Sequence, residues 1–150
     1  MHEHEYHMKL AIDLAKDAEK EGDVPVGAVI VDANGHVIGR GKNRRWLLSS
    51  ATSHAEIEAI EDACKKLGDW RLDGCSLYVT LEPCPMCAGA VIMSRISRLY
   101  YGARDDVTGS CGSVINLFME KFGQSTQVTG GILADECGDL LTGFFKERRG

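Results

Sequence analysis

Hydrophobic positions along the chain recur with two different periods, and each period predicts one type of element. Apolar side chains spaced four apart predict an amphipathic helix over residues 3–21, which ends at Gly22. The members of that apolar stripe are Tyr6, Leu10, Leu14 and Ala18. Further helical patterns cover residues 54–67, 85–94, 113–120 and 134–148. Gly68 follows the first of these patterns, and Pro85 occupies the favoured first position of the second.

Short, nearly all-apolar runs predict strands between these helices. They cover residues 24–31, 36–41, 75–82, 96–103 and 126–132. An Asn-Gly turn over residues 32–35 joins the first two strands, which predicts a hairpin. Residues 42–52 are predicted to form a loop. Strands that alternate with helices indicate an α/β fold, in which helices pack on the faces of one sheet.

Composition and charge narrow the class of protein. The 150 residues are 44% hydrophobic and 26% charged, as expected for one soluble domain over residues 1–150. No apolar run approaches the ~20 residues of a membrane helix, and the polar start is unlike a secretory signal. We therefore expect a cytoplasmic protein with no membrane association, whose six cysteines stay reduced.

The net charge of −5 argues mildly against nucleic acid as a partner. Two basic clusters oppose that argument, although each could equally be a solvated face. The first contains Arg40, Lys42, Arg44 and Arg45, and the second contains Lys146, Arg148 and Arg149.

The segment EPCPMC, residues 82–87, contains half of a four-ligand zinc site. Cys84 and Cys87 have the Cys-x2-Cys spacing, and the chain has no second such pair. A catalytic zinc ion needs only three protein ligands, because its fourth position holds water. Among the five histidines, His54 opens a predicted buried helix and has a carboxylate two residues on, Glu56. With His54 as the first residue of one helix and Cys84 as the N-cap of the next, two positive helix ends meet.

Each of these residues also has a plain structural interpretation. Ser53-x-x-Glu56 fits a capping box, the two cysteines fit a core, and a histidine at a helix start fits the surface. The order His-x-Glu, then Pro-Cys-x-x-Cys, is nevertheless the signature of zinc deaminases and favours a hydrolase. In that interpretation His54, Cys84 and Cys87 hold one Zn²⁺ ion. Glu56 then carries the proton from water to an amino-substituted heteroaromatic ring. The ligand types alone do not distinguish zinc from iron.

Several longer stretches are also informative, namely VPVGAVIV, SHAEIEAI, TLEPCPMCAGAVIMSRI, YYGARD and GILADECGDLLTGFF. Together they resemble the bacterial tRNA-specific adenosine deaminase family, within the cytidine deaminase-like superfamily. The resemblance implies a three-layer α/β/α cytidine deaminase-like fold with a five-stranded mixed sheet. It also implies a zinc-dependent homodimer, without an organic cofactor, that converts adenosine to inosine at the wobble position of a tRNA anticodon.

The resemblance further implies contacts to that substrate. Asn43 matches the asparagine that hydrogen-bonds the flipped base, and Asp105 matches an aspartate near the sugar and backbone of the target nucleotide. The end of the last helix matches a segment that contacts the anticodon loop, through Phe145, Arg148 and Arg149. From its chemistry, Trp46 beside Arg44 and Arg45 could supply stacking and phosphate contacts. A tryptophan in a loop can equally anchor that loop on the core.

Three positions depart from the family pattern. Val107 stands where members often carry a lysine, and Gly123 and Gln124 stand where they commonly carry Asn-His. Fewer phosphate contacts would weaken RNA binding, so a second hypothesis stays open: a deaminase of a free purine base or nucleoside, such as guanine or adenosine. A third is a catalytically silent zinc protein, against which the intact Glu56 argues. An open basic rim around the pocket would favour RNA, and a loop closing over the pocket would favour a small molecule.

Overall fold

The computed structural model describes residues 2–149, and these form one mixed sheet with helices. Along the chain the elements are α1 (His2–Lys20), β1 (Gly27–Val31), β2 (Val37–Lys42), α2 (Arg45–Leu48), α3 (Ala55–Leu67), β3 (Ser76–Leu81), α4 (Pro85–Met93), β4 (Arg98–Ala103), the 3-10 turn η1 (Leu117–Met119), β5 (Gln127–Thr129) and α5 (Ala134–Arg149). The five strands lie in the order β2-β1-β3-β4-β5. Strands β2, β1 and β3 pair antiparallel, whereas β3, β4 and β5 pair parallel. This arrangement confirms the predicted fold class.

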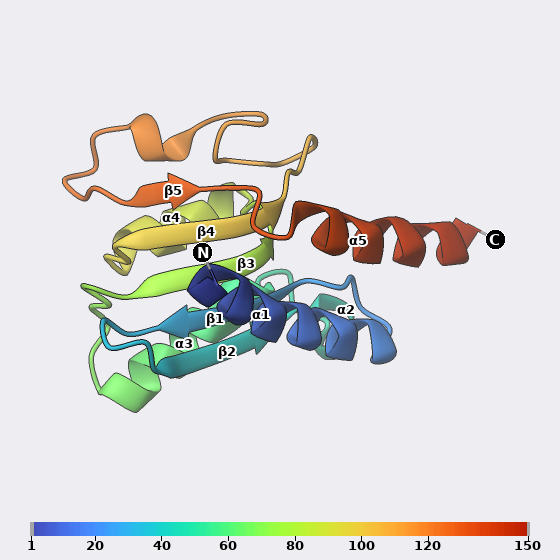
Figure 1. Ribbon diagram of the computed structural model, residues 1–150, viewed down its shortest axis with the longest axis horizontal. Coiled ribbons are helices and arrows are strands. Elements are labelled where there is room, and N and C mark those ends of the chain that lie inside the picture. Colours follow the sequence, from blue (N-terminus) through green and yellow to red (C-terminus); the bar gives the residue numbers. More distant parts are fainter. Residues whose placement is uncertain (1, 150) are drawn as a thin grey trace.

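Helices cover both faces of the sheet (Figure 1). α1 and α5 pack on one face, and α3 and α4 pack on the other. Alternate residues of β1 enter the two layers: Ala28 and Ile30 join the core with α3, and Val29 and Val31 join the core with α1. Every residue of β1 is buried, because helices lie on both sides of this inner strand. The result is the three-layer α/β/α arrangement that the sequence predicts.

Two helices approach the sheet closely, and glycine makes that approach possible. A Cβ atom on Gly41 would lie 2.1 Å from the carbonyl oxygen of Ala55, at the start of α3. A Cβ atom on Gly27 would lie 2.0 Å from the carbonyl oxygen of Ala11 in α1. Both distances are far inside van der Waals contact, so a larger side chain would displace the helix. The first turn of α3, which carries the candidate site, is thereby fixed against β2.

The buried face of α1 differs from the predicted stripe. Tyr6 is 61% exposed, and Leu10 and Leu14 are only half-buried. The hydrophobic side chains that α1 buries are Met8, Ala11, Ile12, Ala15 and Ala18. The close contact over Gly27 requires small residues, and these alanines supply them.

Two predicted segments differ in the structure. The predicted loop 42–52 contains the short helix α2. The predicted helix over residues 113–120 is wrong, because only η1 is helical there, and the side chain of Asn116 caps it by accepting the N–H of Phe118. The chain just before η1 donates the backbone N–H groups of Cys111 and Ser113 to Glu82, which leaves no helical ladder.

Two further expectations concern the environment of the protein. Within residues 2–149, no helix has the length and apolar character needed to cross a membrane. All six cysteines lie in this described part of the chain and have free thiols, as the sequence predicts.

Candidate active site and metal centre

The candidate site lies where the first turns of α3 and α4 meet. His54 is the N-cap of α3, with extended backbone (φ −73°, ψ 154°), and Cys84 is the N-cap of α4. The prediction that His54 is the first residue of its helix is therefore wrong by one position, because His54 precedes α3 as its cap. Neither side chain accepts the usual capping hydrogen bond of its helix, and the two side chains face each other. Nδ1 of His54 lies 3.7 Å from Sγ of Cys84 and 3.4 Å from Sγ of Cys87.

These three side chains fit a tetrahedral metal ion. Their ligand atoms lie within 4.8 Å of one another. For tetrahedral zinc, bonds of about 2.0 Å to nitrogen and about 2.3 Å to sulfur place these two atoms roughly 3.5 Å apart. The observed nitrogen–sulfur distances, 3.4 and 3.7 Å, bracket that value. Among the described residues this is the one such group of His, Cys, Asp or Glu side chains. It offers the three ligands of a catalytic site, not the four of a structural one.

Protons are shared unequally within this group. A hydrogen bond from the Cys87 thiol lowers the pKa of Cys84 to about 4, against the effect of burial and with help from His54. The pKa of Cys87 is raised, because its thiol donates that hydrogen bond and because it is buried. The hydrogen bond with Cys84 raises the pKa of His54, against the effect of burial. The site therefore favours a thiolate at neutral pH, which is the form of cysteine that binds metal.

Glu56 lies in the first turn of α3 and is 4% exposed. Burial raises the pKa of its carboxyl to about 7, opposed by its own backbone N–H and by His54. A carboxyl with a pKa near neutrality can both take and give a proton at physiological pH. The alternative role in a capping box fails, because such a box needs Ser53 as the N-cap and the N-cap is His54.

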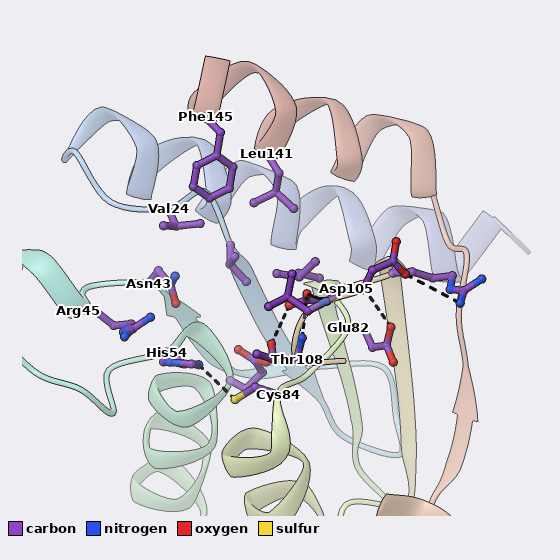
Figure 2. A pocket seen from close by; sticks show the side chains of 16 residues that line it. Val24, Asn43, Arg45, His54, Glu82, Cys84, Asp105, Thr108, Leu141 and Phe145 are labelled. Atoms are coloured by element: carbon purple, nitrogen blue, oxygen red, sulfur yellow. Dashed lines mark hydrogen bonds and ion pairs between the residues drawn. The ribbon is translucent and has the colours of Figure 1, made fainter. Parts of the chain in front are cut away.

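A cavity of about 410 Å³ opens above these residues (Figure 2). Its size lies within the range of small-molecule pockets, about 300–1,000 Å³. The apolar part of its lining consists of Val24, Val26, Leu81, Val107, Leu141 and Phe145. The polar and charged part consists of Asn43, Arg45, His54, Glu56, Glu82, Cys84, Arg104, Asp105, Asp106 and Thr108. This mixture suits a flat ring with polar edges, held against the candidate metal centre.

Asn43 lies on the cavity wall, as the resemblance implies. It is 7% exposed, and its Oδ1 accepts a hydrogen bond of 3.2 Å from the backbone N–H of Ala55. The amide oxygen is therefore engaged in holding the start of α3. The amide NH₂ group remains as the donor for a ligand.

The structure distinguishes Arg44 from Arg45. Nε of Arg44 donates to both carboxylate oxygens of Glu58, at 2.8 and 3.0 Å. This ion pair holds Arg44 against α3, and Arg45, not Arg44, lies on the cavity wall (Figure 2). The neighbouring Trp46 is 51% exposed, and its ring centroid lies 6.0 Å from that of Phe144 in α5. Trp46 thus contacts another element and also presents surface to solvent.

Asp105 lies on the wall opposite Asn43 (Figure 2). Its carboxylate accepts hydrogen bonds within its own loop, from the backbone N–H groups of Val107 and Thr108, at 3.0 and 3.2 Å. It also accepts the hydroxyl of Thr108, at 2.9 Å. Asp105 therefore shapes the turn as well as facing the cavity. Val107 is 82% exposed at the rim of this wall.

Reasoning from the sequence missed Glu82, which lines the same wall and is 1% exposed. The available signal was a carboxylate at the end of an apolar strand and directly before the Pro-Cys pair. Such a position is rarely occupied by an acidic residue unless its charge has partners.

α5 bounds another side of the cavity (Figure 2). Leu141 and Phe145 extend toward the cavity from one face of this helix. Phe145 is 45% exposed. Arg148 and Arg149 belong to the last turn of α5. Their side chains lie outside the described residues, so their contact with an anticodon loop stays a prediction.

The fold and this site together define a zinc-dependent hydrolytic deaminase. The family model for the cytidine and deoxycytidylate deaminase zinc-binding region matches residues 1–103. The tRNA-specific adenosine deaminase of Bacillus subtilis (strain 168) is 49% identical over 150 residues, covering 99% of this chain and 92% of that protein. The chain therefore belongs to the tRNA-specific adenosine deaminase family.

Two solved structures are similar to the chain. One comes from a study of A-to-I editing by tRNA:A34 deaminases at the wobble position of transfer RNA. It has a TM-score of 0.87 and 43% identity, and covers 91% of this chain and 99% of that chain. The other is a guanine deaminase from Nitrosomonas europaea, with a TM-score of 0.82 and 29% identity, covering 93% of this chain and 83% of that chain. The fold is thus shared by deaminases whose names give different substrates.

Proposed function

We infer that this protein hydrolyses the exocyclic amino group of adenosine at the wobble position of a tRNA anticodon, which yields inosine and ammonia. The observation that carries this inference is the His54, Cys84 and Cys87 group beside a buried Glu56. That group occurs in a chain 49% identical to a tRNA-specific adenosine deaminase over almost its whole length.

The residues divide the chemistry between them. His54, Cys84 and Cys87 would hold the zinc ion, which lowers the pKa of a bound water from about 15.7 to about 7. Glu56 takes one proton from the attacking water and gives it to the ring nitrogen, and then passes the second water proton, from the hydroxyl added to the ring, to the departing amino group. Burial, which raises the pKa of this carboxyl in the metal-free protein, favours a group that can both take and give a proton. The reaction needs no organic cofactor, since water and the base supply every atom.

Recognition of a base in an RNA loop requires that the base be turned out and held in a pocket. The NH₂ group of Asn43 is the available donor to the base, because its oxygen is bonded to Ala55. Phe145, on the cavity wall, supplies an aromatic surface for stacking. Arg148 and Arg149, beyond it on α5, would contact phosphates.

A deaminase of free purines is the second candidate, because the guanine deaminase from Nitrosomonas europaea shares the fold at 29% identity. Of the three departures from the family pattern, Val107 lies on the cavity. Gly123 and Gln124 line a separate hollow with Trp70 and Met93. Two of the departures therefore lie away from the catalytic cavity, and the choice of RNA rests on the 49% identity to a tRNA-specific adenosine deaminase.

The test offers purified protein an anticodon stem-loop with adenosine at the wobble position and, in separate reactions, free adenosine and free guanine. The matched control is the same stem-loop with inosine at that position. We expect inosine formation and ammonia release from the adenosine stem-loop alone. Efficient release of ammonia from a free purine, with an inert stem-loop, would establish the second candidate instead.

We also propose that the protein is a homodimer, joined through the outward face of α4. Met86 and Met93 on this face are 36% and 72% exposed, and a Cβ built on Gly89 between them would meet no other element of the described chain within 4 Å. A helix that is apolar all round is normally buried on every side, so a second copy is the expected cover. Sedimentation should show a dimer for the wild type and a monomer for Met93→Lys. A monomeric wild type would contradict this interface.

We further propose a cytoplasmic location, where the six free thiols would stay reduced.

A further inference from the structure

A second buried carboxylate, Glu82, lies at the end of β3 and has no part in the proposed proton transfer. It is 1% exposed. Its Oε2 accepts the backbone N–H groups of Cys111 and Ser113, at 2.8 and 3.2 Å. Its Oε1 accepts the backbone N–H of Asp105, at 3.0 Å, and the hydroxyl of Ser113. Four donors therefore satisfy one buried charge, as burial of an ionised group requires.

All four donors belong to one segment, residues 105–113, whose first four residues line a wall of the cavity. Between β4 and η1 this wall has no helix or ladder strand, so its backbone N–H groups depend on other acceptors. Glu82 supplies the acceptor at both ends of the segment. Figure 2 shows Glu82 on the same side of the cavity as Asp105, across from Asn43 and His54.

A third contact, at Gly109, also joins the segment to the carboxylate of Glu82. A Cβ atom on Gly109 would lie 2.5 Å from Cδ and 2.6 Å from Oε1 of Glu82. The backbone of Gly109 thus passes directly over the carboxylate, and no larger residue leaves room for it. The N–H of Gly109 also donates to the carbonyl oxygen of Asp105, at 2.9 Å. Carboxylate and loop therefore determine each other's position.

We propose that Glu82 is a positioning residue for substrate binding. Its carboxylate fixes the 105–113 wall so that Asp105 and Thr108 meet the substrate at a set distance from the metal centre. This assignment rests on the proposed function. It predicts an effect on KM, because Asp105, whose backbone N–H Glu82 binds, lines the cavity together with Thr108, and neither belongs to the His54, Cys84 and Cys87 group.

Glu82→Gln tests the proposal because the side chain keeps its shape while one acceptor oxygen becomes a donor NH₂. Whichever way the amide lies, at least one of the three backbone N–H groups loses its acceptor. We expect KM for the stem-loop to rise about 10-fold to 100-fold, as small misplacements of binding groups do. We expect kcat to stay within about 3-fold, a factor that corresponds to little change in the barrier. Zinc content should remain at one per chain.

Gly109→Ala disturbs the contact between Gly109 and Glu82 from the side of the loop. It provides a second test if Glu82→Gln does not fold. The same rise in KM is expected, with amide hydrogen exchange accelerated at Asp105, Cys111 and Ser113 in both variants. Asp62→Asn is the matched control, since Asp62 also accepts a backbone N–H, that of Arg40 at 2.9 Å, but lies away from the cavity. Its kinetic constants should equal those of the wild type.

Two results would overturn the proposal. One is a folded, zinc-loaded variant of either kind with lower thermal stability but unchanged KM, which would leave Glu82 a purely structural role. The other is a loss of zinc or of kcat at constant KM, which would place its effect on the metal centre. A wild type inert toward the stem-loop would instead refute the proposed function. Hydrogen exchange would still show whether Glu82 holds the wall.

Discussion

Replacing Glu56 with glutamine removes a proton-binding group and changes little in shape. Glu56 is 4% exposed and lies beside the candidate metal ligands. If it carries the proton, kcat should fall by about 10²-fold to 10⁴-fold, the range typical of general acid–base groups. The zinc content should not change, because no metal ligand is altered.

The same substitution should raise the stability of the metal-free protein. Burial raises the pKa of Glu56 from its ordinary value of 4.5 to about 7. At about 1.36 kcal/mol for each pH unit, ionising this group in the folded state costs up to about 3 kcal/mol. Because the folded pKa lies above the unfolded one, the cost is absent below about pH 4.5 and complete above about pH 7. Metal-free Glu56→Gln should therefore exceed metal-free wild type in stability at pH 8 and match it near pH 4.

The assay combines stem-loop kinetics and zinc analysis with urea unfolding of the chelated proteins at both pH values. Wild-type protein taken through the same chelation is the control. Activity within a few-fold of wild type would show that Glu56 is not the proton carrier. An equal difference in unfolding free energy at both pH values would show that burial does not perturb its carboxyl as argued.

Three other outcomes follow from the geometry. Cys87→Ser should lose zinc and lower the melting temperature, because the metal joins α3 to α4; a wild type that stays fully active after exhaustive chelation, with no metal found, would refute the metal site. Gly41→Ala places a Cβ 2.1 Å from the carbonyl oxygen of Ala55, and should cost about 1–3 kcal/mol of stability and weaken zinc binding. Unchanged thermal unfolding and zinc affinity would contradict that contact. Replacing Arg148 and Arg149 with alanine should raise KM for the stem-loop and reduce the salt slope by about one unit for each lost phosphate contact. An unchanged KM and salt slope would argue against this role.

The metal group was predictable because each of its two halves is local in sequence, although the halves lie 30 residues apart. A histidine and two cysteines at helix starts, with a carboxylate two residues after the histidine, specify both the elements and the chemistry. The layer arrangement was predictable for a similar reason, since apolar runs alternate with helical patterns along the whole chain. The sequence did not predict the exact start of α3. In the structure His54 is the N-cap of this helix, which excludes the capping-box role for Glu56.

The remaining features depend on partners far along the chain. The donors to Glu82 lie 23 to 31 residues after it, so no local pattern marks it as the anchor of a loop. The apolar run over residues 113–120 has a helical pattern, but those distant bonds prevent a helix. Arg44 and Arg45 are adjacent and chemically alike. In the structure Arg44 forms an ion pair and Arg45 lines the cavity, because the carboxylate of Glu58 binds Arg44.

The spacing of the metal ligands also has a consequence for folding. Cys84 and Cys87 are neighbours in the chain, whereas His54 precedes Cys84 by 30 residues. In the unfolded chain the two thiolates can already capture a metal ion, while His54 must await closure of that long loop and the pairing of β1 with β3. Metal bound to the unfolded chain subtracts from the stabilisation that binding gives the native state. The metal therefore stabilises the fold by less than its affinity for the native site alone implies, and the stabilisation that remains is the contribution of His54 and the architecture that delivers it.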